Sequence, residues 1–370
     1  MNNRSATLLF FLWLFVQAEV YTQVLNTTTM DTLETTYKGH VAIEGYVDTY
    51  FGYNFSNTND QSIPYYVSSA RNNQFHINLA YIQVRYRSKG MRARFTPGVG
   101  TYMNDNYAAE PGTLKNIVEA NVGVLLSEKR KIWIDAGVFA SHYTNESALS
   151  KDQLMYTRSM GPENAPYYLT GAKLSVPLSK QVNAYFFLLN GWQVIEDNNN
   201  GKSIGTQLEY QPVSSMLFNW NTYLGDERSG VNPDYRTRFF TDLFWIYQPN
   251  AKFDATSCIY FGWQQVSNSS TRKWWHANIN GRYNFTDTWS LSGRFEYFSD
   301  PELALLSPIT SASSFYAFST GACVNYKVHS NAMLRMEMKK LFSPDALFLN
   351  SENQETKSNL IGVVSLTAWF

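Results

Sequence analysis

Apolar and polar residues alternate along most of the chain from residue 41 to the end. The stretches VAIEGYVDTYF (41–51), GMRARFT (90–96), KWWHANINGRYNF (273–285) and NAMLRMEMKKLF (331–342) all show this period of two. A period of two is typical of β-strands, because successive side chains point to opposite faces of a sheet. Each stretch is about ten residues long, which is the length of a tilted strand that crosses a bilayer. The pattern therefore predicts an all-β protein with strands long enough to span a membrane.

The segments between the predicted strands alternate between short and long. Short turns are expected at 87–90, 127–131, 178–181, 213–215, 248–252, 286–288 and 329–331, and long loops at 54–73, 100–113, 142–166, 192–202, 225–236, 265–272, 299–312 and 343–357. Outer-membrane barrels combine short periplasmic turns with long extracellular loops. We therefore predict, over residues 40–370, a single transmembrane antiparallel β-barrel of about 16 strands, with both chain ends on the short-turn side.

Two stretches depart from simple alternation. In QFHINLAYIQVRYR (74–87) the pattern slips between Tyr81 and Ile82, which predicts a β-bulge at that point. In TRFFTDLFWIYQ (237–248) both faces are largely apolar, so the pattern leaves open which face meets lipid.

Alternation alone does not separate a membrane barrel from a secreted soluble β protein that binds a partner. Aromatic residues gather near predicted strand ends, as in the girdles at the two membrane interfaces. Closure of sixteen strands into a barrel also removes the open edges that a single large sheet would expose. These observations favour the barrel, and the aromatic residues involved are Tyr50, Phe51, Tyr53, Phe55, Trp274, Trp275, Tyr297, Phe298, Trp369 and Phe370.

The N-terminal residues MNNRSATLLFFLWLFVQA have the pattern of an export signal. Arg4 supplies a positive charge, an apolar run covers 6–16, and Val16 and Ala18 fit a small-x-small cleavage site. The run is shorter than the roughly 20 residues that a membrane-spanning helix needs. We predict a secretory signal peptide over 1–18, followed by a polar, Thr-rich periplasmic extension over 19–39.

The chain ends on an aromatic residue, with apolar residues at alternate positions before it. Phe370, Ala368, Leu366 and Val364 share one parity. This ending resembles the assembly signal of outer-membrane β-barrel proteins. It implies that the last strand is read by the barrel-assembly machinery and that the protein resides in the outer membrane of a Gram-negative bacterium.

Composition and charge exclude several classes of function. The formal net charge is zero and charged residues are only 16% of the chain, so no basic field for nucleic acid exists. The five His are scattered, and the two Cys, Cys258 and Cys323, do not have zinc-ligand spacing. No G-x-S-x-G motif, P-loop or dinucleotide motif occurs. We predict no enzyme activity, no catalytic residues, no metal site and no cofactor; whether the two Cys form a disulfide stays open.

The middle of the chain resembles the OmpL-like β-barrel porin family of the Bacteroidetes. The stretches that carry the resemblance are EANVGVLL (119–126), WIDAGVFASH (133–142), ESALSKD (146–152), TRS (157–159) and ENAPYYLTGAKLS (163–175). The chain departs from the usual form of the family at 143–145 and at Pro162. The resemblance implies an outer-membrane channel but identifies no substrate.

The polar face of the predicted strands supplies the candidate pore lining. In general porins the third long loop folds into the lumen, so by similarity the loop 142–166 is a candidate constriction, with Glu146, Asp152, Arg158 and Glu163 as its charged members; the alternative is an ordinary surface loop. Because positive and negative residues are nearly matched, we expect weak ion selectivity. The charged wall candidates are Arg85, Arg87, Arg92, Arg94, Lys173, Arg282, Arg294, Arg335, Lys339, Glu44, Asp48, Glu119, Glu209, Asp254, Glu296 and Glu337.

Two kinds of channel fit these features. The first is a porin for passive diffusion of small hydrophilic solutes, and the second is a substrate-specific channel, for example for oligosaccharides. The second needs a ladder of inward aromatic residues on which sugar rings stack, and Tyr46, Tyr50, Tyr185, Phe187 and Tyr223 have the required parity. The expected partners are outer-membrane lipid, the barrel-assembly machinery and small hydrophilic solutes; a homotrimer is an open alternative.

Overall fold

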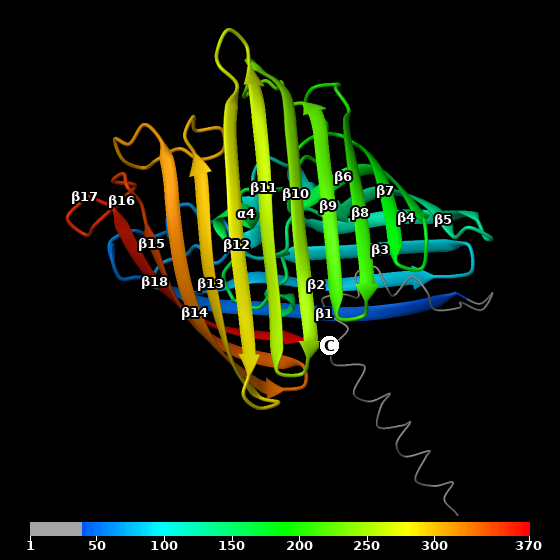
Figure 1. Cartoon of the computed structure of the whole chain (residues 1–370), viewed down its shortest axis with the longest axis horizontal. Coiled ribbons are helices and arrows are strands. Elements are labelled where there is room, and N and C mark those ends of the chain that lie inside the picture. The colour runs from blue at the N-terminus through cyan, green and yellow to red at the C-terminus, as the bar shows by residue number, and fades with distance from the viewer. Residues whose placement is uncertain (1–38) are drawn as a thin grey trace, which may run out of the picture.

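The computed structural model describes residues 39–370; the predicted signal peptide (1–18) and residues 19–38 of the predicted extension lie outside the described residues. Within this part of the chain, sixteen strands form one closed antiparallel barrel (Figure 1), which confirms the predicted fold class. The barrel strands are β1 (His40–Asn54), β2 (Gln74–Arg87), β3 (Met91–Val99), β4 (Ile117–Ser127), β5 (Ile132–Ala140), β6 (Tyr168–Pro177), β7 (Val182–Leu189), β8 (Ser203–Val213), β9 (Met216–Asp226), β10 (Tyr235–Asn250), β11 (Phe253–Val266), β12 (Arg272–Asn284), β13 (Trp289–Asp300), β14 (Phe315–His329), β15 (Ala332–Phe342) and β18 (Ser358–Trp369).

Each strand pairs with its neighbours in the sequence, and β1 pairs with β18 to close the barrel, with Tyr46 opposite Trp369. Short turns and longer loops alternate strictly from β1 to β18. Of the helices in residues 39–370, none is long and apolar enough to cross a membrane. The longer loops carry the helices α3 (Thr101–Asn106) and α4 (Met160–Glu163), the 3-10 helices η2 (Gly112–Asn116) and η3 (Ser150–Asp152), and the hairpin β16 (Phe348–Leu349) and β17 (Glu355–Thr356).

Strand β18 shows how each strand divides its side chains between two faces. Leu366 is 49% exposed and Val364 is 43% exposed, whereas Thr367 is 0% and Ser365 is 2% exposed. A continuous row of exposed aliphatic side chains is stabilised when lipid, rather than water, covers it. The outer face of the barrel therefore meets the bilayer, and the polar face points into the lumen.

Strand β10, whose pattern leaves its orientation open, follows the same rule. Phe240 and Phe244 point inward and are buried, while Leu243 is half exposed on the outer face. Phe244 packs with Leu217 and Cys258 in an apolar cluster on the inner face. The lumen thus contains apolar side chains at this position, which is why the two faces of β10 look alike in the sequence.

The prediction of aromatic girdles was correct for some residues and wrong for others. Phe51, Trp275 and Phe370 lie on the outer face, and Phe370 is 74% exposed. Trp274 and Phe298 are fully buried inside the barrel. An aromatic residue near a strand end belongs to a girdle only when its side chain points to the lipid face of the strand. The inward aromatic residues that were wrongly assigned to the girdles are Tyr50, Trp274, Phe298 and Trp369.

The predicted bulge at Tyr81 and Ile82 was also misplaced. These two residues pair regularly with Tyr46 and Gly45. The register instead shifts opposite Asp48, where Asn78 is the extra residue. The side-chain amide of Asn78 donates a hydrogen bond of 2.9 Å to Asp48, so the bulged residue still points into the polar interior.

Candidate pore and its inner loop

The loop between β5 and β6, residues 141–167 and called here the inner loop, lies inside the barrel. In Figure 1 its helix α4 is seen within the outline of the strands. Ser150 contacts the Tyr46 hydroxyl on β1 at 2.9 Å. On the other side of the loop, the amide of Asn145 donates to Asn278 on β12 at 3.0 Å. The inner loop therefore crosses the lumen and contacts strands that are far apart in the sequence.

Wall carboxylates accept hydrogen bonds from the backbone N–H groups of the inner loop. Asp242 on β10 accepts from the N–H of Thr144 at 2.9 Å. Glu296 on β13 accepts from the N–H of Met160 at 2.6 Å, and Glu337 on β15 accepts from the N–H of Tyr156 at 2.7 Å. Backbone donors buried away from water must be paired. The inner-face acids of β10, β13 and β15 meet this requirement.

Wall cations bind the backbone carbonyls of the same loop. Arg294 on β13 donates to the carbonyl of Thr157 at 2.5 Å, and Arg335 on β15 donates to that of Ser150 at 2.5 Å. Lys339 on β15 donates to the carbonyl of Arg158 at 3.0 Å. Charge-assisted hydrogen bonds of this kind contribute about 1.5–3 kcal/mol each. Both signs of charge on this wall therefore hold the loop through its backbone.

Ion pairs reinforce the contact between the loop and the wall. Arg294 lies 2.6 Å from Glu146 of the loop, and both side chains are almost completely buried. On the wall itself, Lys339 pairs with Glu296 at 2.8 Å, again without exposure to solvent. Removing one partner of a buried pair leaves an uncompensated charge, which costs about 3–5 kcal/mol. The loop is therefore fixed in place.

Close packing between α4 and β12 depends on Gly161. A Cβ atom at this position would lie 2.2 Å from Nδ1 of His276 and 2.3 Å from its Cγ. His276 is fully buried and lies 3.4 Å from Glu296. Glycine therefore allows the loop backbone to lie directly against the histidine ring.

The outer half of the lumen is filled by aromatic side chains. Tyr143 of the inner loop packs edge-to-face on Phe240, and Trp192 from the loop between β7 and β8 packs on both Phe240 and Tyr223. His142 stacks on Phe187 at 4.1 Å. Tyr223 and Phe187, two members of the predicted aromatic ladder, are therefore covered by loops.

The other ladder residues are covered to different degrees. The hydroxyl of Tyr46 lies against the inner loop, and that of Tyr50 accepts from the N–H of Arg71 at 3.1 Å; both rings are buried. Tyr185 is partly exposed, and its hydroxyl donates to Glu209 at 2.8 Å. The structure thus places one of the five aromatic residues where a solute in the lumen could reach it.

The inner face of β2–β7 near the short turns, called here the open wall, carries ion pairs that keep some contact with solvent. Arg92 pairs with Asp135 at 2.6 Å and Arg94 pairs with Glu119 at 2.7 Å. Arg85 pairs with Glu44. The side chain of Arg94 is 36% exposed, whereas that of Arg294 on the opposite wall is 0% exposed. The inner loop therefore lies against the inner face of β9–β15, β18 and β1, which is called here the covered wall. The open wall stays in contact with the water of the lumen.

Gly123 lets the Arg92–Asp135 pair form across an intervening strand. Arg92 is on β3 and Asp135 is on β5, and Gly123 on β4 is the direct neighbour of both. A Cβ atom at Gly123 would lie 2.1 Å from the Asp135 carboxylate and 3.1 Å from Arg92 Cγ. Arg92 donates through both Nε and Nη2, each at 2.6 Å, and its guanidinium lies 4.5 Å from the ring centre of Trp133. Arg92 is therefore held in one orientation.

The predicted site residues fall into two groups that the sequence did not separate. Glu146, Arg158 and Glu163 of the inner loop are buried, and Asp152 is partly exposed beside Lys151. On the walls, Arg282 pairs with Asp254 at 2.8 Å near the short-turn end. The candidates of the open wall are Arg85, Arg87, Arg92, Arg94, Glu119 and Lys173, and those in contact with the inner loop are Arg294, Glu296, Arg335, Glu337 and Lys339.

Sequence reasoning missed several residues of this arrangement. Asp135 lies in a stretch that carries the family resemblance and shares the inner parity of its strand, so its alternation was the available signal. Asp242 was hidden by the ambiguous pattern of β10. Gly123 and Gly161 gave no signal, because a glycine that makes room for a neighbour is recognised only when the neighbour is known.

Between residues 39 and 370, no three His, Cys, Asp or Glu side chains form a group that could hold a metal ion. Cys258 and Cys323 are both free and buried, so the disulfide left open by the sequence does not form.

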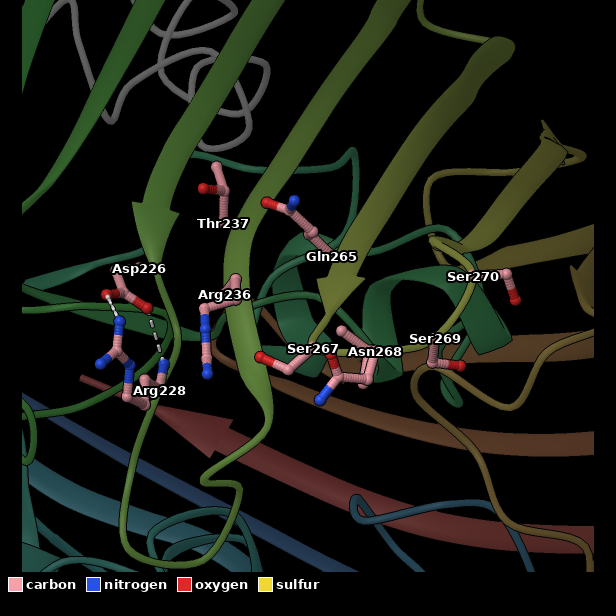
Figure 2. Close-up of a pocket in the computed structure, with 10 residues that line it drawn as sticks. Asp226, Arg228, Arg236, Thr237, Gln265, Ser267, Asn268, Ser269 and Ser270 are labelled. Carbon is pink, nitrogen blue, oxygen red and sulfur yellow. Dashed lines mark hydrogen bonds and ion pairs between the residues drawn. The ribbon is translucent and has the colours of Figure 1, made fainter.

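A polar cavity of about 850 Å³ opens at the long-loop end of β9–β11 (Figure 2). Arg228 pairs with Asp226 at 3.5 Å on one side of the cavity, and Arg236 lies on the neighbouring strand. Burial raises the pKa of the nearby Glu227 carboxyl above its ordinary value, although the guanidinium of Arg238 acts in the opposite direction. The remaining lining residues are Thr237, Gln265, Val266, Ser267, Asn268, Ser269 and Ser270. Val266 is the one apolar residue of this lining, so the cavity is suited to water and polar solutes.

Several solved structures of outer-membrane channels share this fold. The outer membrane channel DcaP of Acinetobacter baumannii has a TM-score of 0.61 at 9% identity, covering 91% of this chain and 99% of that one. The anion-selective porin from Comamonas acidovorans has a TM-score of 0.58 at 10% identity, covering 90% and 100%. The trimer form of OmpT, an outer membrane protein of Vibrio cholerae, has a TM-score of 0.57 at 11% identity, covering 90% and 99%. Likeness at these identities shows the fold alone.

The family of the chain follows from its sequence. No curated protein matches it. A family model described as "Putative beta-barrel porin-2, OmpL-like" matches residues 40–370, which is the whole barrel. The predicted resemblance is confirmed, and with it the prediction of an outer-membrane channel. The chain belongs to the OmpL-like β-barrel porin family and is a porin of the Gram-negative outer membrane.

Proposed function

We propose that this porin is a passive channel for small hydrophilic solutes, and that the inner loop is its constriction. The observation that carries the proposal is the unequal exposure of the two walls. The inner loop covers β9–β15, β18 and β1, whereas charged side chains of the open wall keep contact with solvent. Solutes then pass between the loop and the open wall, filtered by size and charge. No chemical step is needed.

The charges of the lumen support only weak ion selectivity. Most exposed cations of the open wall have an acidic partner, as in Arg85–Glu44 and Arg94–Glu119. Paired charges present a much weaker field to a passing ion than isolated ones.

Planar-bilayer recording of the refolded protein tests this function. We expect stable, ohmic single-channel steps, and liposome swelling rates that fall smoothly as the radius of neutral solutes increases. A protein that inserts into the bilayer but gives no conductance would contradict the proposal. Heat-modifiable mobility on a detergent gel provides the control for folding, because a closed barrel resists detergent unfolding.

A channel specific for oligosaccharides is the second candidate. It would show saturable block of the current by sugars, which a general porin does not show. The partly exposed ring of Tyr185 favours it, but the burial of Tyr46, Tyr50, Phe187 and Tyr223 leaves no continuous ladder for stacking. We therefore rank this function second.

The final residue supports a role of the last strand in assembly. Phe370 exchanges two backbone hydrogen bonds with Gly45 on β1, at 2.9 and 3.0 Å. Its ring covers Gly45, where a Cβ atom would lie 2.1 Å from the ring. Phe370 thus completes the seam between the first and last strands and presents an aromatic ring at the rim.

Deletion of Phe370 should reduce the amount of protein inserted in the outer membrane more than it changes the conductance of the inserted fraction. Quantitative blotting of membrane fractions, together with bilayer recording, measures both effects. Insertion at the wild-type level would contradict recognition of this ending by the barrel-assembly machinery. Association as a homotrimer, as in the trimer form of the Vibrio protein, is a separate proposal that chemical crosslinking of the membrane-inserted protein tests.

A further inference from the structure

Four arginines gather at the short-turn end of the open wall. In the pairing of β2 with β3, Arg85 lies opposite Arg94 and Arg87 lies opposite Arg92. Directly opposed residues of an antiparallel pair have Cβ atoms about 4.5–5.5 Å apart, and like charges in such positions repel each other. These four residues, called here the arginine quartet, therefore concentrate positive charge in one small region of the lumen.

The acids that pair with Arg85, Arg92 and Arg94 are for the most part less exposed than the arginines. The side chain of Asp135 is 3% exposed beside Arg92 at 15%, and that of Glu119 is 9% exposed beside Arg94 at 36%. Glu44 is the exception, at 41% beside Arg85 at 27%. Arg94 shows the difference most clearly, because its side chain keeps contact with solvent while that of Glu119 is almost buried. At this position a solute in the lumen meets positive charge first.

The inner loop does not present a compensating acidic surface. Glu146 and Glu163 are buried in pairs with Arg294 and Arg158. Asp152 keeps some exposure, but Lys151 lies 2.9 Å from it with a similar exposure. The three acids of the loop are therefore neutralised, and the open wall decides the sign of the field.

We propose that the arginine quartet makes this porin prefer small anions, such as carboxylates and phosphates, over cations of the same size. Guanidinium groups bind these anions through parallel hydrogen bonds. Because Arg85, Arg92 and Arg94 each also pair with a carboxylate, binding stays weak enough for release, as conduction requires. This inference rests on the proposed channel function and specifies its ion preference. The selectivity is weak and favours anions.

Reversal potentials in a potassium chloride gradient test the inference. We expect wild-type protein to pass chloride better than potassium. In the double variant Arg85→Gln/Arg94→Gln, the chloride-to-potassium permeability ratio should fall about twofold to fivefold for each charge removed, since a unit charge a few ångströms from the ion path acts at this scale. If the double variant does not fold, Arg94→Gln alone serves, because the side chain of Arg94 is more exposed than those of Arg85 and Arg92.

Lys340→Gln is the matched control, because Lys340 is exposed on the outer face of β15. It removes the same charge without touching the lumen and should leave the ratio unchanged. A wild-type channel that prefers potassium, or a double variant with an unchanged ratio, would overturn the inference. Absence of any conductance would instead overturn the proposed channel function, so the two failures are distinguishable.

Discussion

The two walls of the lumen use the same residue types in opposite ways. On the covered wall, Arg294 is fully buried and binds the inner loop through a backbone carbonyl and Glu146. On the open wall, Arg94 is 36% exposed and pairs sideways with Glu119 on the next strand. A charged inward residue of a barrel can therefore either hold a loop or face the water of the lumen. The path of the inner loop determines which of these two roles a residue has.

The largest expected effect comes from Arg294→Met on the covered wall. It leaves Glu146 and Glu337 buried without their common cation, so the free energy of unfolding should fall by about 3–5 kcal/mol. Urea unfolding in lipid vesicles measures this change. Arg85→Gln is the matched control on the open wall and should cost about 0–1 kcal/mol, because Arg85 and its partner Glu44 both keep contact with solvent. Equal losses in the two variants would remove the distinction between the walls.

Gly161→Ala should loosen the inner loop with a smaller effect. The added methyl group would overlap the His276 ring, and overpacking of this kind costs about 1–3 kcal/mol. We expect the buried thiols of Cys258 and Cys323, which lie on the covered wall, to react faster with a water-soluble thiol reagent. Gly90→Ala is the control, because a Cβ atom there would have no atom within 4 Å. Unchanged thiol reactivity in Gly161→Ala would contradict the tight packing of α4 on β12.

Gly123→Ala should have the smallest effect on stability and a specific effect on the open wall. The new Cβ atom would force Asp135 and Arg92 apart. Because Arg92 keeps 15% exposure and can turn toward the water of the lumen, we expect a cost of about 1 kcal/mol, the low end for overpacking. Single-channel conductance should change while the two native thiols stay unreactive. Faster reaction of these thiols would show that a change on the open wall loosens the covered wall. This result would contradict the independence of the two walls.

The sequence was sufficient to predict the barrel, but not to predict which inward residues contact the inner loop and which face the water of the lumen. Period-two alternation and the order of short and long connections predict the strands, because both are local properties. Arg94 and Arg294 look identical by these criteria, since both are inward arginines in the middle of alternating strands. What separates them is the path of the inner loop, which depends on contacts between residues more than 100 positions apart, such as Arg294 with Glu146.

The same limit explains the misassigned aromatic residues. Trp274 and Trp275 are neighbours at a strand end, yet the first packs inside the barrel and the second faces lipid. The prediction of a girdle used only the clustering of aromatic residues near a strand end. The decisive property is whether the position of each residue in the alternation points its side chain to lipid or to the lumen. An inward tryptophan also requires an apolar loop above it, which local sequence does not show.

Thiol labelling during bilayer recording tests most directly the claim that solutes pass along the open wall and not the covered one. Asn121 lies on β4 opposite Arg94, and the native Cys258 and Cys323 are buried on the covered wall. In Asn121→Cys, a negatively charged thiol reagent should react rapidly at the new position and lower the conductance, while the wild-type protein stays unmodified until it is unfolded in urea. Reaction of the native thiols at the rate of the introduced one, or an inert Asn121→Cys, would contradict this account of the pore.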